Sequence, residues 1–243
     1  MKTGIRTFCL IAAVLAVAGT AGATLTPVGT ATYNGSDYNL IWDDAQSLVW
    51  LDYSAPSLYW PNQMAWAAGL DGQLTYNWDP AYSVTWAETA WRLPDAGAAP
   101  SYGCQAATQE LGHLYYTGLG LEGGSSTAGA TAPDLSSGPF ENLTMAAYWT
   151  RTEDPIDYGF FVVDAAWMFA FRETRSTPYN DTVFGFQDID SNGTGWLSPT
   201  HSALAVRGAQ VQGGGPVIPE PATLAGLVLG AGGLVGYVRR RRR

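Results

Sequence analysis

The two ends of this 243-residue chain are targeting segments, and they limit the part that can fold as a globular domain. Residues 1–23 have a basic start, an apolar run and a small-residue site immediately before Thr24. This order predicts a secretory signal peptide, which is removed during export. We therefore expect the globular domain over residues 24–211, followed by a glycine-rich linker over residues 212–218.

The C-terminal segment, residues 219–243, has three parts in a fixed order. Pro219-Glu220-Pro221 is followed by the uncharged run 222–238, and the last five residues are all arginine. The run approaches the roughly 20 apolar residues that a membrane-spanning helix needs. The positive-inside rule would hold the terminal arginines in the cytoplasm. The sequence therefore predicts one transmembrane helix over residues 222–238, with the body of the chain outside the membrane.

This order resembles the PEP-CTERM sorting signal of Gram-negative bacteria, with Pro219, Glu220 and Pro221 as the sorting motif. The resemblance implies recognition by an exosortase, a membrane protease thought to remove such tails during surface sorting. The expected route is export through the inner membrane, transient anchoring by the C-terminal helix, and release to the cell surface or extracellular matrix. A plain C-terminal membrane anchor is the alternative.

The body of the chain is strongly acidic and contains no lysine. Without the two ends, five of the 12 basic residues and 20 of the 21 acidic residues remain, so residues 24–218 carry a net charge of −15. Such a body repels phosphate backbones and anionic lipids, and nucleic acid is therefore not an expected partner. Cations and neutral polymers such as glycans are compatible partners.

Cys104 is the only cysteine of the exported part, because Cys9 belongs to the signal peptide. One cysteine forms no internal disulfide, so the domain must be stabilised by its core. A body of about 190 residues is long enough to bury one. A buried small residue is the simplest interpretation of Cys104, and a reactive thiol or an intermolecular bridge is the alternative.

The residue pattern predicts short strands, two short helices and long loops. Strands are expected before the Asn34-Gly35 turn, at 38–42 and 47–51 as a hairpin, and at 91–94, 148–150, 158–163, 166–172 and 203–211, with a half-buried alternation in 166–172. Helices are expected at 62–69, opened by Pro61, and at 108–116, with Thr108 as N-cap and Leu111, Leu114 and Tyr115 as an apolar stripe. A surface loop or irregular hairpin is expected at 73–90, and a flexible insertion at 118–138.

Several segments of the body together resemble the Lcl C-terminal-domain family, a bacterial extracellular module. In family order they are Trp42-Asp43 with Leu48-Val49-Trp50, the helix 64–69, Trp91-Arg92-Leu93-Pro94, Glu110-Leu111 with Leu114, Tyr148-Trp149-Thr150, Ala165-Ala166 with Phe169, and Ala205-Val206-Arg207-Gly208. The resemblance implies an α+β, C-type-lectin-like domain with two short helices, a small antiparallel or mixed sheet and long loops, used for adhesion or ligand binding. It supplies no catalytic residues. Related sulfatase-modifying enzymes use a cysteine pair, which a chain with Cys104 alone lacks.

Three residues form the start of a calcium-loop pattern. Asp188, Asp190 and Asn192 stand at alternate positions, and Gly193 would permit the sharp turn that follows. An EF-hand would place a glutamate at the twelfth position, which here is Pro199. A looser calcium site is therefore one interpretation, with calcium as the one candidate cofactor. An ordinary solvated turn is the other.

Other groups suggest no defined chemistry. His113 and His201 are far apart and have no cysteine nearby, so neither a metal site nor a triad can be assembled from them. The carboxylate pairs Asp43-Asp44 and Glu153-Asp154 are adjacent in sequence, and adjacent side chains on a strand or turn usually diverge.

Two further groups have competing structural and functional interpretations. Arg92 and Arg207 are scarce cations within apolar strands, and we expect them to pair with buried carboxylates. Tyr76, Trp78, Tyr82 and Trp86 could form a platform for sugar rings or simply fasten their loop to the core.

These observations predict an exported, surface-sorted, non-catalytic module that binds a glycan or an extracellular-matrix component. An enzyme acting on envelope polysaccharide and a self-assembling structural matrix protein are the alternatives.

Overall fold

Strands dominate the part of the chain that the computed structural model describes, which is residues 23–104, 109–125, 134–135, 138–160, 162–172, 174–176, 181–191 and 199–213. The large sheet contains β1 (Leu25–Tyr33), β2 (Ser36–Asp43), β3 (Leu48–Leu58), β4 (Thr75–Trp78), β5 (Tyr82–Trp86), β7 (Ala147–Glu153), β10 (Ala165–Ala170), β13 (Phe186–Ser191) and β14 (His201–Gly213). A three-stranded sheet contains β6 (Gly124–Ser125), β11 (Thr174–Ser176) and β12 (Asp181–Phe184), while β8 (Ile156–Asp157) and β9 (Val162–Val163) form a hairpin. The helical segments are α1 (Trp60–Gly69), a 3-10 turn (Leu70–Gly72), α2 (Glu110–His113) and a π-helical turn that continues α2 (Leu114–Gly118).

The predicted α+β, C-type-lectin-like class is therefore wrong, because a large mixed sheet makes up most of the described structure. Part of the error lies in segments that were expected to be loops. Residues 73–90 contain β4 and β5, and Asp188 and Asp190 lie within strand β13. The predicted transmembrane span 222–238 lies outside the described residues. Within the described residues, no helix has the length and apolar character needed to cross a membrane.

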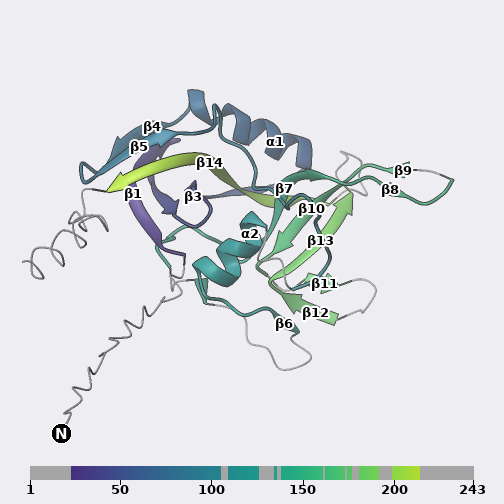
Figure 1. Cartoon of the computed structure of the whole chain (residues 1–243). Coiled ribbons are helices and arrows are strands. Elements are labelled where there is room, and N and C mark those ends of the chain that lie inside the picture. Colours follow the sequence, from purple (N-terminus) through teal and green to yellow (C-terminus); the bar gives the residue numbers. More distant parts are fainter. Residues whose placement is uncertain are drawn as a thin grey trace, which may run out of the picture.

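Strand β14 is the strand that joins the two halves of the large sheet (Figure 1). The strand order is β13-β10-β7-β14-β3-β2-β1-β4, and β5 also pairs with β14. The first part of β14 pairs antiparallel with β3 through residues 201–208, and its last part pairs antiparallel with β5 through residues 209–213. Ser202 also pairs with Tyr148 of β7 in the parallel direction. Three strands, β3, β5 and β7, therefore form backbone pairs with β14.

The N-terminal strands follow the turn signals of the sequence. Asn34 and Gly35 have φ angles of 50° and 80°, the positive values that a tight type I′ hairpin turn requires. They connect β1 and β2, which pair antiparallel, and β2 pairs in turn with β3 through partners such as Leu40 and Leu51. The predicted first strand and hairpin are confirmed.

The buried side chains form three clusters, and each contains one tryptophan that is almost completely buried. Trp50 belongs to the cluster beneath α2, Trp91 to the cluster enclosed by β1–β5 and the end of β14, and Trp149 to the cluster beneath α1. Fully burying one large apolar side chain stabilises a fold by about 1.5–3 kcal/mol. Each cluster is thus anchored by a ring from a different part of the chain.

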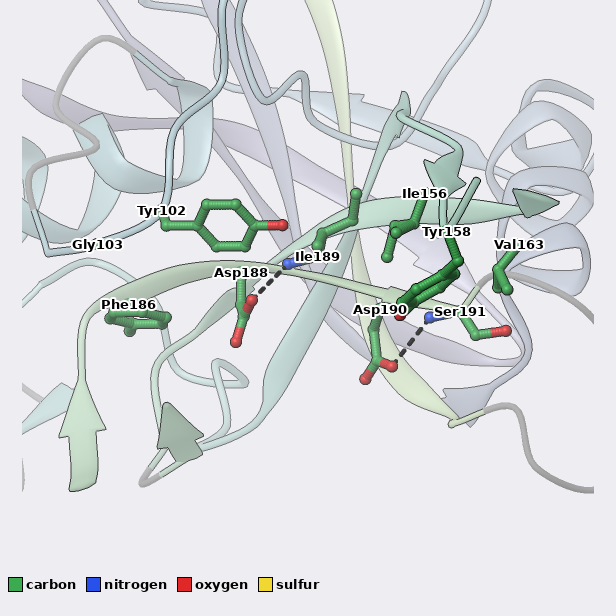
Figure 2. Close-up of a pocket in the computed structure, with 10 residues that line it drawn as sticks. All are labelled: Tyr102, Gly103, Ile156, Tyr158, Val163, Phe186, Asp188, Ile189, Asp190 and Ser191. Carbon is green, nitrogen blue, oxygen red and sulfur yellow. Dashed lines mark hydrogen bonds between the residues drawn. The ribbon is translucent and has the colours of Figure 1, made fainter. Parts of the chain in front are cut away.

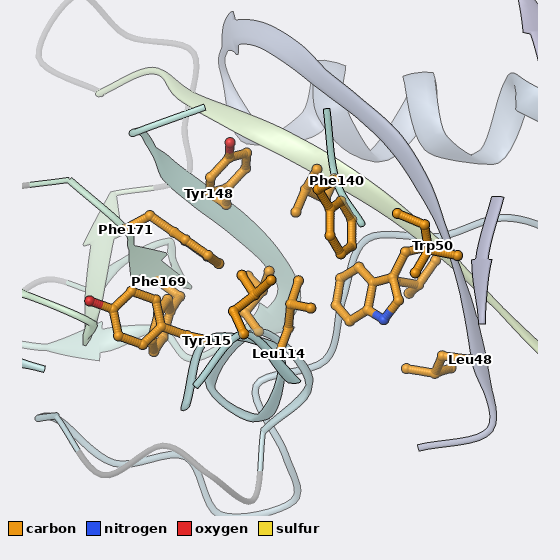
Figure 3. Packing of buried hydrophobic residues seen from close by; sticks show 13 residues of the cluster. Leu48, Trp50, Leu114, Tyr115, Phe140, Tyr148, Phe169 and Phe171 are labelled. Atoms are coloured by element: carbon orange, nitrogen blue, oxygen red, sulfur yellow. The ribbon is translucent and has the colours of Figure 1, made fainter. Parts of the chain in front are cut away.

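Helix α2 covers the first cluster with the apolar stripe that the sequence predicts. Leu111, Leu114 and Tyr115 are all buried, and Tyr115 contacts the rings of Phe169 and Phe171 at centroid distances of 5.5 and 5.2 Å (Figure 3). The predicted N-cap, Thr108, lies outside the described residues.

Strand β10 is buried on both faces, which corrects the predicted half-buried pattern. Phe169 packs into the cluster beneath α2, whereas Met168 and Ala170 pack into the cluster beneath α1. All six residues of β10 are buried. Alternate side chains of β10 therefore point into two different buried clusters, and neither face of the strand is exposed to solvent.

Arg92 and Arg207 both pair with carboxylates, but the prediction that these carboxylates are buried is wrong for Asp71, the exposed partner of Arg207. The Arg92 guanidinium donates to both carboxylate oxygens of Glu110 at 2.7 and 2.8 Å and to Glu88 at 2.9 and 3.1 Å. The Arg207 guanidinium donates to Asp71 and to the carbonyl oxygens of residues 88 and 89, and it lies 4.4 Å from the centre of the Trp86 ring. These contacts tie β14 and α2 to the loop between β5 and α2.

The Arg92 network supplies a test of the fold. We expect Arg92→Gln to lower the free energy of unfolding by about 2 kcal/mol or more, because it leaves the largely buried Glu110 carboxylate without its counter-charge. Arg151→Gln is the matched control: Arg151 also pairs with a carboxylate, Asp95, but the Arg151 side chain is 41% exposed. Its loss should cost less than about 1 kcal/mol. If denaturant titrations show that the two variants lose the same free energy of unfolding, a structural role specific to Arg92 is contradicted.

Candidate functional site

A cavity of about 680 Å³ lies along the outer strand of the large sheet, β13 (Figure 2). Its walls come from three segments: the loop at residues 102–103, the β8–β9 hairpin and β13 itself. The lining residues are Tyr102, Gly103, Ile156, Tyr158, Val163, Phe186, Asp188, Ile189, Asp190 and Ser191. The lining thus combines aromatic and aliphatic side chains with two carboxylates.

The loop that carries Tyr102 is fastened to the edge of β13 by backbone hydrogen bonds. Gly103 and Gln187 exchange two N–H···O bonds of 3.1 and 3.0 Å, as in an antiparallel bridge. Gly103 has a φ of +124°, which side chains with a Cβ rarely tolerate, so a glycine suits this position. The bridge holds the Tyr102 ring 5.0 Å from that of Trp167 while 59% of Tyr102 stays exposed.

The β8–β9 hairpin forms the outer wall of the cavity. Ile156 pairs with Val163, and the Gly159 N–H donates to the Asp157 carboxylate at 2.7 Å in the turn. Tyr158 is 53% exposed and Phe160 is 86% exposed. The Tyr158 ring of this hairpin therefore lines the cavity while it remains in contact with solvent.

Asp188 and Asp190 enter the cavity because alternate residues of a strand point to the same face. Asp188 is only 7% exposed, and one of its oxygens accepts a hydrogen bond from the Ile189 N–H at 2.8 Å. Burial raises the pKa of the Asp188 carboxyl above its ordinary value; the Ile189 hydrogen bond opposes this shift, and the charge of Asp190 adds to it. The cavity thus holds a carboxylate in a partly apolar setting.

Asp190 is held in place by two neighbours. Its Oδ1 accepts from the Ser191 N–H at 2.9 Å, and its Oδ2 lies 3.1 Å from Nε2 of His201. The His201 ring is buried against Trp149 at a centroid distance of 4.4 Å, and its Nδ1 has no hydrogen-bond partner among the described residues. The proton therefore belongs on Nε2, from which His201 donates to Asp190.

The structure places the predicted site residues in different settings. Asp188 and Asp190 line the cavity together, whereas Asn192 lies outside the described residues. Within the described residues, no group of three or more His, Cys, Asp or Glu side chains is arranged to hold a metal ion. Two carboxylates on one strand offer few of the six to eight oxygen ligands that calcium takes, so the calcium site stays a prediction.

The other candidate groups have structural partners. The Asp43 carboxylate is fully buried and accepts from the Gln46 side chain at 2.8 Å, while the neighbouring Asp44 accepts from the Thr24 N–H at 2.7 Å, so the two carboxylates diverge. The Tyr76 and Trp78 rings stack, and both contact the Trp86 ring at steep angles. Trp86 in turn meets the buried Trp91 ring edge to face, and Tyr82 packs against the same cluster. These aromatic residues therefore fasten β4 and β5 to the core.

Cys104 follows the Tyr102 loop and is partly buried. Burial raises the pKa of its thiol, and a hydrogen bond with the Tyr116 side chain opposes that shift. A thiol in this setting is mostly protonated, which favours a packing role over reactivity.

The aromatic lining was missed by the sequence reasoning. Tyr102 and Tyr158 are far apart along the chain, and nothing near either residue marks a site. The usable signals were glycines beside both rings, Gly103 and Gly159, which have positive φ angles in the structure and allow the turns that present the rings.

Comparison with known proteins identifies the C-terminal segment. Residues 217–243 match the PEP-CTERM protein-sorting motif, which confirms the predicted sorting signal. The match is confined to this segment, and nothing in the comparisons supports the resemblance of the body to the Lcl C-terminal-domain family. No curated protein and no solved structure matches the chain. The chain thus carries the signal of an exported protein that an exosortase recognises and sorts to the surface or the extracellular space.

Proposed function

We propose that this protein is a non-catalytic binding module of the cell surface or extracellular matrix, and that the cavity along β13 binds a glycan. One observation carries the proposal: exposed rings of Tyr102 and Tyr158 stand beside the carboxylates of Asp188 and Asp190 in a single cavity. The sorting signal supports it, because a protein delivered outside the cell meets polysaccharide there.

The chemistry of the lining suits a sugar. A flat aromatic face can pack against the apolar face of a pyranose ring, and a carboxylate accepts hydrogen bonds from hydroxyl groups. The cavity volume of about 680 Å³ falls within the range of small-ligand sites, roughly 300–1,000 Å³. The exposed ring of Phe160, which follows Tyr158 and Gly159 in the chain, would extend the contact along a polymer.

The arrangement of the carboxylates favours binding over hydrolysis. Glycosidases usually place two carboxyl groups on opposite sides of the scissile bond. Asp188 and Asp190 instead project from the same face of one strand, and Asp190 is occupied by His201. An enzyme acting on envelope polysaccharide is therefore the less favoured function.

The position of the sorting segment suggests how the module reaches its ligand. We propose that residues 222–238 anchor the chain in the inner membrane until the exosortase acts at the Pro219-Glu220-Pro221 motif. Strand β14 extends to Gly213, two residues into the predicted linker, so residues 214–218 separate its end from this segment in the sequence and would let the protease reach the motif without disturbing the sheet.

The glycan proposal predicts the behaviour of two single variants. We expect the full-length protein to be retained on immobilised exopolysaccharide, and Tyr102→Ala and Tyr158→Ala each to weaken binding about 3- to 10-fold through loss of ring contact. Met145→Ala, which removes an exposed side chain outside the cavity lining, is the control and should bind normally. Absence of retention across a glycan panel would refute the proposal, and release of new reducing ends would identify an enzyme.

The sorting proposal predicts the mass of the exported protein. Replacing Glu220 by alanine should leave the C-terminal segment attached, so that the protein stays in the membrane fraction at its longer mass. Intact-mass measurement of membrane and extracellular fractions would reveal this, with a deletion of the exosortase as the parallel control. Normal shortening and release of Glu220→Ala would argue against recognition through this motif.

A further inference from the structure

We propose that the cavity along β13 selects glycans that carry a protonated amine, as in a glucosamine unit without its acetyl group. This inference rests on the proposed glycan-binding function and names the chemical class of the ligand. The cavity combines a buried carboxylate, for which the described part of the chain supplies no counter-charge, with aromatic rings open to solvent, and both attract an ammonium group.

Among the residues that the structure describes, no cation pairs with the buried Asp188 carboxylate. Its side chain is more than nine-tenths buried, and the hydrogen bond that the structure gives it comes from the backbone N–H of Ile189. The cavity lining named above contains no arginine, lysine or histidine. Buried charges in proteins are normally paired, because an unpaired charge loses its hydration without compensation. An ammonium group bound in the cavity would supply the missing partner.

A comparison with Asp52 shows that a buried carboxylate in this protein can have a full set of hydrogen-bond donors, which Asp188 does not have. The Asp52 carboxylate is also buried, but it accepts hydrogen bonds from the Glu141 and Asn142 N–H groups and from the Asn142 side chain, at 2.8, 3.0 and 3.2 Å. Asp52 thus holds a loop in place and faces no cavity among those described. Asp188 makes no comparable structural contribution.

The two carboxylates of the cavity have different roles. Both oxygens of Asp190 are engaged, one by the Ser191 N–H and one by His201, so Asp190 contributes negative charge from a fixed position. Asp188 has only one oxygen engaged, which leaves the other as an acceptor for a ligand N–H. Asp188 is therefore the group we expect to contact the amine.

The aromatic rings reinforce the preference for a cation. An ammonium group near the face of a tyrosine ring is attracted by the negative face of its π system. Burial raises the pKa of the Tyr102 hydroxyl, and the negative charges of Asp188 and Asp154 add to this shift. A cation at Tyr102 would lie in the same negative field.

The melting temperature of the unliganded protein tests whether the unpaired charge of Asp188 destabilises the fold. Because the folded-state pKa of Asp188 is raised, its carboxyl favours folding below the ordinary pKa of 3.8 and loses that contribution as the pH rises through the folded-state value. Asp190, Asp154, Tyr102, Tyr158 and His201, which contacts Asp190, are the charged and titratable groups that face this region, and the variant changes none of them. We therefore expect Asp188→Asn to raise the melting temperature at pH 8, with a smaller gain at pH 4.

Asp52→Asn is the matched variant for this measurement. It should lower the melting temperature at pH 8, because an amide would place its own N–H groups against backbone donors. A fall in melting temperature for Asp188→Asn like that for Asp52→Asn would give Asp188 a structural role and overturn the inference.

The binding experiment uses two probes that differ only at nitrogen: the glucosamine tetramer and the N-acetylglucosamine tetramer. We expect calorimetry at pH 6 with the full-length protein to show at least tenfold tighter binding of the glucosamine tetramer. Asp188→Asn should remove this preference, so that the variant binds the two tetramers with equal affinity. Asp37→Asn is the control, because Asp37 is exposed on β2, which is five places from β13 in the strand order.

The outcomes separate the inference from the proposed function. Equal binding of the two tetramers would overturn the amine preference while glycan binding stands. Binding of neither tetramer, together with no retention on exopolysaccharide, would overturn both. Equally tight binding of a tetralysine peptide would show that the cavity recognises ammonium groups without the sugar, which would overturn the assignment to amino sugars.

Discussion

The backbone hydrogen bonds of β14 are the interaction on which the rest of the structure depends. This one strand pairs with β3, β5 and β7, and its residues from His201 to Ala209 are all buried. Removing it would separate the N-terminal hairpins from β7, β10 and β13, so both the core and the cavity depend on it. Arg207 adds side-chain bonds from the same strand to the loop that follows β5.

The cavity exists because β13 is the outer strand of this sheet. An edge strand leaves backbone groups unpaired, and proteins usually cover them. Here Gly103 covers part of the edge through its two hydrogen bonds with Gln187, which brings Tyr102 to the side chains of β13. The same protection of an exposed edge therefore also assembles the candidate site.

Local features of the fold could be predicted from the sequence, whereas features that depend on distant pairing could not. The Asn34-Gly35 turn and the apolar stripe at Leu111 and Leu114 rest on short-range patterns. Strand β13 was missed because Asp188 to Ser191 are residues typical of turns; its pairing with β10, as between Trp167 and Ile189, overrides that preference. Alternate spacing identified Asp188 and Asp190 as a pair, but Tyr102 and Tyr158 reach them only through tertiary contacts.

The place of β14 in the chain also determines when the domain can fold. It is the last described strand, and the linker that follows it leads directly to the sorting segment. A sheet that is completed by its final strand cannot close while that strand is still being synthesised or translocated. The central pairing of the large sheet therefore forms only after nearly the whole described body of the chain is available.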